Sequence, residues 1–298
     1  MALVSDMPAV AARRERSGIA HFLIRLFREK PLGAAGGVIF VLFLLCGIFA
    51  DALAPYGMNQ ISPRNRLLPP SLAWPFGTDN LGRDMLSRCL YGAQLSVIIA
   101  FTAATLATIV SIVIGILTGY LGGKIDLVTQ RFVDAWMSFP DLIILLVVVS
   151  VLGPGIPQIV GTLGLLLGIA GSRIIRSAVV SVRENMYVHA AQSIGASTRR
   201  ILWRHILPNI MPPIIVLFTT RVGTVILAES SLSFLGLGVP PPTPTWGGML
   251  SGSGRTFMFQ GPWLALAPGL CLTVVVYATN VFGDALRDLL DPRMRGSR

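Results

Sequence analysis

The sequence predicts an all-α integral membrane protein with six transmembrane helices and both termini in the cytoplasm. Of the 298 residues, 53% are hydrophobic and 13% are charged, whereas about 25% of the residues in soluble domains are charged. Mean hydropathy is +0.71. Six apolar stretches are long enough to cross a bilayer core of about 30 Å as helices. Lys and Arg are also unevenly divided between alternate connections, which indicates the orientation.

The six predicted helices occupy approximately 33–53, 93–119, 130–152, 157–175, 210–231 and 263–285. The third is the weakest, because its purely apolar run covers only Leu142–Leu152 and needs the preceding turns to span. The first follows a basic segment and lacks a small-residue cleavage site, so we predict a transmembrane helix and not a signal peptide.

The basic residues orient the predicted helices. Eighteen of the 24 Lys and Arg lie in segments on the N-terminal side of the membrane, five lie on the other side, and Arg221 lies within a predicted helix. Positive residues gather in cytoplasmic connections, so the N-terminal side is predicted to be cytoplasmic. The net charge of +10 therefore orients the chain, and we predict no nucleic-acid partner because the basic residues are not interleaved with aromatic ones.

This topology divides the chain into four regions. Residues 1–32 form a cytoplasmic N-terminal segment, and 33–92 hold the first transmembrane helix and an extracytoplasmic loop. Residues 93–285 form a five-helix core with a cytoplasmic loop at 176–208 and an extracytoplasmic loop at 232–262, and 286–298 form a cytoplasmic tail. Both extracytoplasmic loops are rich in Pro and Gly but contain aromatic residues, which predicts ordered loops with small helices.

Catalytic and cofactor-binding motifs are missing from the sequence. The closest match to a phosphate-binding loop, TGYLGGKI at 118–125, lacks the first Gly and the final Ser or Thr. The three His and three Cys show no metal-ligand spacing and no disulfide framework. We therefore predict that this chain is not an enzyme and holds neither a metal nor a cofactor.

The loop 176–208 carries a basic helical hairpin between two apolar stretches. Gly195 is predicted to end one helix and Ser197 to cap a second, which runs over 198–207 before Pro208 opens the next transmembrane helix. In the second helix Arg199, Arg200 and Arg204 lie on one face and apolar residues lie on the other. Two interpretations are open: a helix lying on the lipid surface, or a helix–turn–helix presented to a cytoplasmic partner.

The spacing in this loop resembles the Glu-Ala-Ala, three residues, Gly, nine residues, Ile, one residue, Leu-Pro pattern of bacterial ABC importer permeases. His189 replaces the Glu and His205 replaces the Ile. The segments FGTDNLGRDMLSRCLYGAQ (76–94) and ILAESSLSFLGLGVPPPTPTWGGML (226–250) resemble the second permease subunit of oligopeptide, dipeptide and nickel importers. The resemblance assigns coupling to an ATPase to His189, Ala190, Ala191, Ser193, Ile194, Gly195, Ala196, Ser197, Arg199, His205, Leu207 and Pro208.

The resemblance further implies a type I ABC importer permease in the bacterial cytoplasmic (inner) membrane. The implied partners are a homologous second permease, two ATP-binding subunits that hold ATP and Mg, an extracytoplasmic substrate-binding protein and membrane lipid. The implied cargo is a di- or oligopeptide. A nickel chelate or another small solute is the alternative within this family, and a stand-alone secondary transporter is the alternative outside it.

Two charged residues lie within the fifth predicted helix. Arg221 and Glu229 are separated by about 12 Å along a helix axis, so direct pairing is not expected. Charges at this depth face protein or water. They are either packing residues or candidates for the translocation path, where Arg221 would meet a substrate carboxylate. The glycines Gly161, Gly164, Gly168 and Gly171 predict close helix packing, which we assign to the contact between the two permeases.

Overall fold

The structure is a computed structural model that describes residues 18–290, and those residues form a helical bundle without β-strands. The β-type pairing among the described residues is a single isolated bridge between Thr78 and Asp84. Five helical stretches are long and apolar enough to cross a membrane. They are α2 (Pro31–Ile48), α4 (Met85–Leu121), α7 (Ile156–Arg183), the run Thr198–Phe234 that ends in α10 (Met211–Phe234), and α13 (Trp263–Leu290).

A bent pair of helices is the candidate for the sixth span. The predicted helix over 130–152 is divided into α5 (Gly123–Met137) and α6 (Asp141–Leu152), which meet at an angle of 80°. Pro140 lies at the break, and proline disfavours the α conformation of the residue before it as well as removing a donor. The predicted third helix is therefore broken at Pro140, in agreement with its short apolar run.

Two spans extend beyond the apolar stretches that predicted them. α4 begins at Met85 rather than near 93, because Asp84 caps it: Asp84 Oδ2 accepts hydrogen bonds from Ser87 N and Ser87 Oγ, both at 2.7 Å. α7 continues to Arg183, eight residues past the predicted end. Capping and tertiary packing determine these ends, and neither depends on hydropathy.

Glycines bring α4 and α7 into the closest contact in the bundle. A Cβ atom at Gly115 would lie 2.7 Å from Ile175 Cβ, and one at Gly168 would lie 2.7 Å from Val110 Cβ. A Cβ at Gly161 would meet nothing within 4 Å. The predicted close packing is therefore present, but Gly164 and Gly168 contact α4 and Gly171 contacts Arg221 of α10, all in the same chain. The assignment of these three glycines to the contact between permeases is therefore wrong.

The helices near the two termini pack together. A Cβ at Gly36 of α2 would lie 2.7 Å from Ala278 O of α13. The short helix α1 (Gly18–Glu29) joins them through buried Leu26, and Lys30 Nζ lies 2.5 Å from Asp288 Oδ2. The predictions for residues 1–17 and 291–298 fall outside the described residues.

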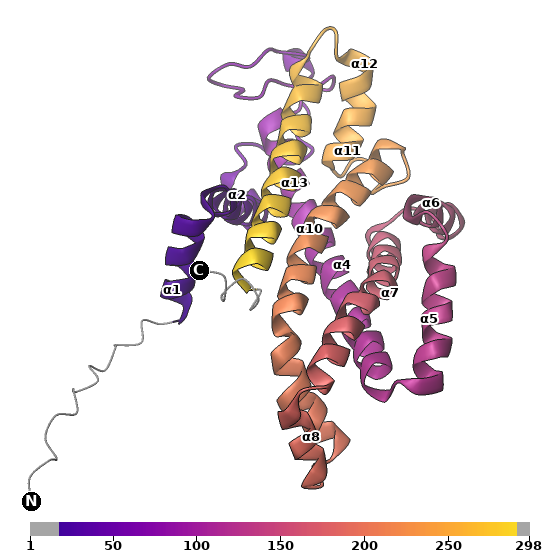
Figure 1. The fold of residues 1–298 in the computed structure, drawn as a ribbon. Helices are drawn as coiled ribbons and strands as arrows, with labels where there is room; N and C mark the ends of the chain where they lie inside the picture. The colour runs from indigo at the N-terminus through magenta and orange to yellow at the C-terminus, as the bar shows by residue number, and fades with distance from the viewer. Residues whose placement is uncertain (1–17, 291–298) are drawn as a thin grey trace, which may run out of the picture.

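The two ends of the bundle differ (Figure 1). One end carries α8 (Met186–Ser193), and the other carries the loops 54–84 and 235–262 with four short helices. These are η1 (Pro63–Asn65), α11 (Trp246–Met249), η4 (Leu250–Gly254) and α12 (Arg255–Phe257). Trp246 is 2% exposed and its Nε1 donates to Cys89 O at 3.1 Å, so the Pro- and Gly-rich loops are ordered by packing on α4.

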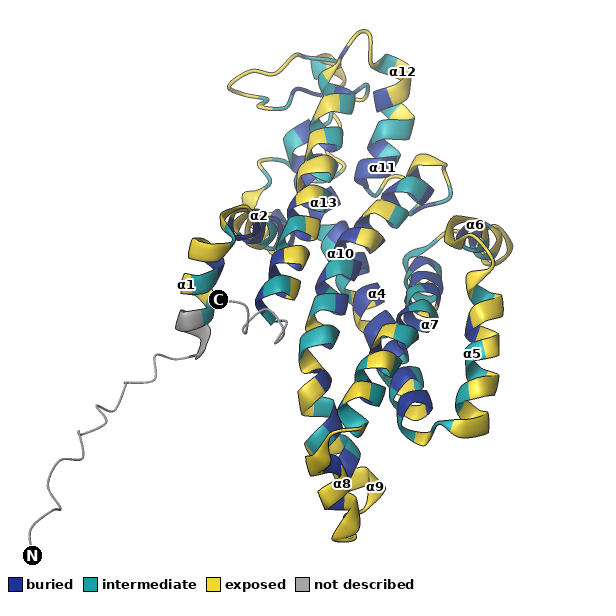
Figure 2. Ribbon diagram, in the orientation of Figure 1, coloured by how far each residue is buried: buried dark blue, intermediate teal, exposed yellow. Residues whose placement is uncertain are grey.

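Large apolar side chains also cover the outside of the bundle, as expected for contact with lipid or with another membrane chain (Figure 2). On α13 the exposed residues recur at helical spacing and form a single stripe. They are Leu266, Leu270, Val274 and Tyr277. In water such a surface would be a large apolar patch, so the burial pattern supports the membrane interpretation of the composition.

The α4–α7 contact is tested by enlarging one glycine of α7. Gly168→Leu should lower the free energy of unfolding by about 1–3 kcal/mol or more, because overpacking forces Val110 and its neighbours apart. The measurement is unfolding of the purified chain in detergent. Gly161→Leu, in the same helix, is the matched control and should have little effect; equal losses from the two variants would contradict the contact.

Candidate functional site

The loop between α7 and α10 begins with a short helix that ends on a glycine. α8 terminates in a Schellman motif: Ala196 N donates to Ala191 O at 3.0 Å and Gly195 N donates to Gln192 O at 2.9 Å. Gly195 has φ = +76°, a conformation in which a side chain is strained. No atom lies within 4 Å of a Cβ placed at Gly195. Within this chain the glycine is required by backbone geometry, and it also leaves open space beside it.

The second part of the loop is continuous with α10. Ser197 Oγ accepts from Arg200 N at 3.4 Å and starts α9 (Thr198–Ile201). A π-helical turn, η2 (Leu202–Ile206), and a 3₁₀ turn, η3 (Leu207–Ile210), then lead directly into α10. The expectation that Pro208 opens a separate helix is wrong, since Pro208 lies inside one helical run from Thr198 to Phe234.

The π-turn accommodates the missing N–H of Pro208. Leu207 N donates to Leu202 O, five residues back, in place of the usual four. Asn209 Nδ2 donates to His205 O at 2.6 Å and so supplies a side-chain donor to a carbonyl of the same π-turn. Widened turns of this kind absorb an irregularity without ending a helix. The loop is thereby joined to α10 without a flexible connection.

The inner face of the loop is a hydrophobic cluster. Val188 and Ile206 are fully buried and Ala191 is 7% exposed. They pack with Ile175 and Val179 of α7, Ile210 of η3 and Ile214 of α10. Ala191 therefore packs against this chain, while Ala190 is exposed. The small residue at 191 makes room for the chain's own core, and the one at 190 remains available to a partner.

The outer face of the loop exposes large apolar side chains. Met186 is 88% exposed, Ile194 is 85% exposed and Trp203 is 66% exposed. Trp203 shares a shallow hollow with four polar residues of α9 and its extension: Ser197, Arg199, Arg200 and Arg204. Neither Met186 nor Trp203 was predicted from the sequence. A signal was available for Trp203, since this apolar residue falls on the predicted basic face of the helix.

The two histidines that depart from the family pattern lie in different surroundings. His189 is exposed, and His205 is half-buried with its ring centroid 6.2 Å from that of Tyr187. Ser193 Oγ donates to His189 O at 3.1 Å. His205 therefore fills an interior position where the pattern has Ile, and His189 is presented to solvent.

Arg221 is buried where three helices meet. It is 5% exposed, and its Nη2 donates to Ser111 Oγ of α4 at 2.9 Å and to Leu167 O of α7 at 2.5 Å. Nη1 is buried without a hydrogen-bond partner among the described residues. A Cβ atom at Gly171 would overlap Nη2. Arg221 is thus a packing contact of α10 with α4 and α7, and its Nη1 has no hydrogen-bond acceptor among the described residues.

Glu229 lies about two turns further along α10 and has no cationic partner in residues 18–290. It is 1% exposed, and its Oε1 accepts from Ser233 Oγ at 2.6 Å. Ion pairs of the described chain do not include Arg221 or Glu229. The two groups are thus separate sites on one helix.

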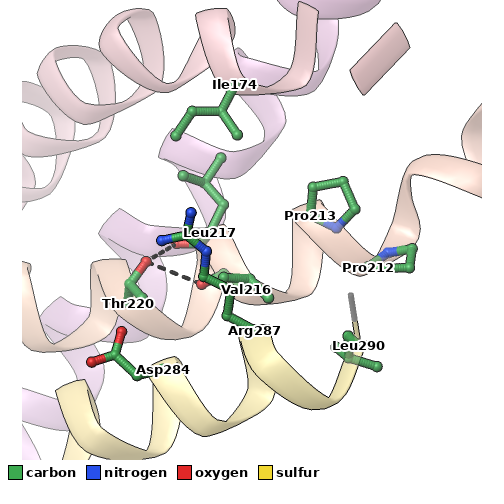
Figure 3. A pocket seen from close by; sticks show the side chains of 9 residues that line it. All are labelled: Ile174, Pro212, Pro213, Val216, Leu217, Thr220, Asp284, Arg287 and Leu290. Atoms are coloured by element: carbon green, nitrogen blue, oxygen red, sulfur yellow. Dashed lines mark hydrogen bonds between the residues drawn. The ribbon is translucent and has the colours of Figure 1, made fainter. Parts of the chain in front are cut away.

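A cavity of about 420 Å³ opens between α7, α10 and α13 (Figure 3). Pro212, Pro213 and Leu217 supply apolar walls, while Asp284 and Arg287 of α13 point into the same space. Neither charged residue forms an ion pair with another described residue. Metal-binding clusters of His, Cys, Asp or Glu are likewise not found in the described chain.

Long membrane spans, a rigid polar hairpin at one end and buried unpaired charges define a class: a polytopic membrane permease. Residues 111–296 match the family described as "Binding-protein-dependent transport system inner membrane component", and residues 23–70 match the "N-terminal TM domain of oligopeptide transport permease C". The chain belongs to the first of these families and is therefore an inner-membrane component of a transport system that depends on a binding protein.

Relatives extend over almost the whole chain. It is 40% identical to the dipeptide transport system permease protein DppC of Alkalihalophilus pseudofirmus, covering 90% of this chain and 88% of the relative. It is 34% identical to the probable D,D-dipeptide transport system permease protein DdpC of Escherichia coli K12, over the full length of both. It is 38% identical to the glutathione transport system permease protein GsiD of an Escherichia coli O1:K1 strain, covering 99% and 97%.

The packing of Arg221 against Gly171 can be tested by a double-mutant cycle. Arg221→Ala should cost about 1–3 kcal/mol, because Ser111 Oγ and Leu167 O lose a charged donor. Gly171→Ala should also destabilise, because its methyl group displaces the guanidinium. In the double variant the second change should cost little, since the collision has been removed. Additive losses in unfolding experiments would contradict this contact.

Proposed function

We propose that this chain is the permease subunit of an ATP-driven peptide importer and forms half of the translocation path. Its partners are a homologous second permease, two ATP-binding subunits and an extracytoplasmic substrate-binding protein. The observation that best supports this function is the outer face of the α8–α9 loop. Apolar and basic side chains are exposed there, on helices whose inner face packs against α7 and α10. The names of the relatives, which refer to dipeptides, D,D-dipeptides and glutathione, support a short peptide as cargo.

The loop is suited to transmit movement from an ATPase. Its inner face shares one hydrophobic cluster with α7 and α10, and its second half continues into α10 as a single helical run. A force applied at Trp203 would therefore reach Arg221 along one helix. The residues we assign to coupling are those of the family pattern, from His189 to Pro208, together with Met186 and Trp203.

The α8 end is assigned to the cytoplasm and the opposite end to the extracytoplasmic side. In this topology the coupling loop 176–208 faces the ATP-binding subunits, which hold ATP and Mg, and the loop 232–262 faces the binding protein. The excess of Lys and Arg on the α8 side supports the assignment. Interaction with lipid would occur along the exposed apolar faces of the spans.

We propose that Arg221 contacts the solute in the translocation path, in addition to packing against α4 and α7. Its partnerless Nη1 retains donor capacity in a region of low dielectric, where a substrate carboxylate would be a strong acceptor. Movement of α7 relative to α10 would give a solute access to this nitrogen. Glu229, also buried without a counter-ion, is the second candidate on the same helix. Arg221→Ala with normal assembly and normal uptake would contradict the role of Arg221.

The proposed function is tested by uptake into proteoliposomes that contain the purified transporter, its binding protein and internal ATP. Labelled dialanine should accumulate, and omission of ATP should abolish accumulation because the proposed ATP-binding subunits supply the energy for transport. Labelled nickel chelate is the alternative cargo. If the nickel chelate were taken up and dialanine were not, the proposed peptide cargo would be wrong. Uptake of dialanine in the absence of ATP would favour a stand-alone secondary transporter.

The coupling face is tested by Trp203→Ser, which removes the large exposed side chain at the centre of the basic hollow. ATP-binding subunits should co-purify at least several-fold less, because aromatic anchors contribute about 2 kcal/mol or more at interfaces. Phe259→Ser is the matched control: Phe259 is 93% exposed, but at the opposite end of the bundle. Equal loss of the ATP-binding subunits in both variants would contradict the assignment.

A further inference from the structure

A second cavity lies at the end of the bundle opposite α8, between segments far apart in the sequence. Its volume is about 540 Å³, within the range of about 300–1,000 Å³ that is usual for small-molecule sites. Residues 80–88, at the start of α4, form one wall, and residues 233–257 form the other. The second wall contains α11, η4 and α12, which Figure 1 shows at this end.

The charges that line this cavity are both positive. They belong to Arg83 and Arg88. Asp79, fully buried behind them, is the carboxylate that both approach: Arg83 Nε lies 2.7 Å from Asp79 Oδ2, and Arg88 Nε lies 3.9 Å from the same atom. Asp79 also accepts backbone hydrogen bonds from Leu81 N and Arg83 N. Two guanidinium groups therefore share one carboxylate, so neither has Asp79 to itself.

Arg88 is the less well paired of the two arginines. It is 7% exposed, and the one hydrogen bond that its side chain donates to a described residue runs from Nη1 to Met58 O at 3.4 Å. Arg83 holds Asp79 at a shorter distance, so Arg88 is the weaker partner of the shared carboxylate. A guanidinium has five N–H donors, and a buried cation with so few acceptors is stabilised by an additional anion.

The remaining lining supplies neutral hydroxyl groups. Those of Thr243, Thr245, Ser253 and Thr256 donate to no described residue, whereas Ser251 Oγ donates to Gly248 O at 3.3 Å. Ser233, also in the lining, donates to buried Glu229, so the cavity adjoins the second charged candidate of α10. Hydroxyls around a guanidinium suit an oxyanion, because both donate to the same oxygens.

We propose that this cavity is an anion site that takes a carboxylate of the transported solute at the extracytoplasmic entrance, with Arg88 as its charged anchor. Arg83 is a positioning residue that holds Asp79. The identification of the anion as a solute carboxylate rests on the proposed function, because short peptides carry a terminal carboxylate. The volume supports a small solute, since it exceeds what one acidic side chain of a docking protein would fill.

The site is tested by protection of an introduced cysteine. Thr256 lines the cavity and is exposed, so Thr256→Cys should react with a charged maleimide in the assembled transporter in proteoliposomes, with the unsubstituted chain giving the background from Cys46, Cys89 and Cys271. Dialanine should slow the reaction, and dialaninamide, which lacks the carboxylate, should require a concentration at least about tenfold higher.

Two variants test whether Arg88 supplies the positive charge that binds the carboxylate. Arg88→Gln in the Thr256→Cys background should raise the half-protecting concentration of dialanine about tenfold or more. Arg66→Gln is the matched control, because Arg66 is an exposed arginine of the loop that precedes α4 and does not line the cavity. The comparison of acid and amide does not need Arg88→Gln, so the proposal remains testable if that variant fails to assemble.

The outcomes separate this proposal from the proposed function. Uptake of dialanine without protection, or equal protection by the acid and the amide, would overturn the anion site and leave the importer standing. Protection without uptake would support the site and overturn peptide import. Protection by the unliganded binding protein that depends on Arg88, without protection by dialanine, would show that a protein carboxylate occupies the cavity and would overturn the proposal.

Discussion

The close approach of α4 and α7 is the constraint on which the bundle depends. Gly115 and Gly168 remove the side chains that would separate the two helices, and Gly171 leaves room for the guanidinium of Arg221. Arg221 then reaches Ser111 on α4 and the α7 backbone. A polar contact at this depth is favourable only where backbone and hydroxyl acceptors are already in place. Packing of small residues thus permits a charge that lipid would exclude.

The same helices carry the exposed loop. The end of α7 and the start of the Thr198–Phe234 run share one hydrophobic cluster with α8, and the π-turn before Pro208 keeps the run unbroken. The apolar groups exposed at the loop differ in setting from those along the spans. They occur beside arginines, whereas the spans present continuous apolar stripes. A protein partner with both apolar and charged groups on its surface would match the loop. Lipid or another membrane helix would match the spans.

Buried and incompletely paired guanidinium groups occur at two depths of the bundle. Arg88 lies at the end with the Pro- and Gly-rich loops, and Arg221 lies within α10 where three spans meet. Each is held by a scaffold that uses only part of its donor capacity. An anionic solute that moved from one to the other would exchange one set of charged hydrogen bonds for another, so neither site would need to bind tightly for the solute to be guided.

The sequence by itself determined the membrane class, the places of five spans, and the Gly195 and Ser197 boundaries of the loop, because apolar run length, charge and capping are local properties. The tertiary structure alone decided that Gly168 packs within the chain and that Arg83 and Arg88 share Asp79 at a cavity. It also placed Pro208 inside a helix, where the preference of proline for the first turn predicts a new start. These outcomes depend on distances between residues remote in sequence, which no local pattern contains.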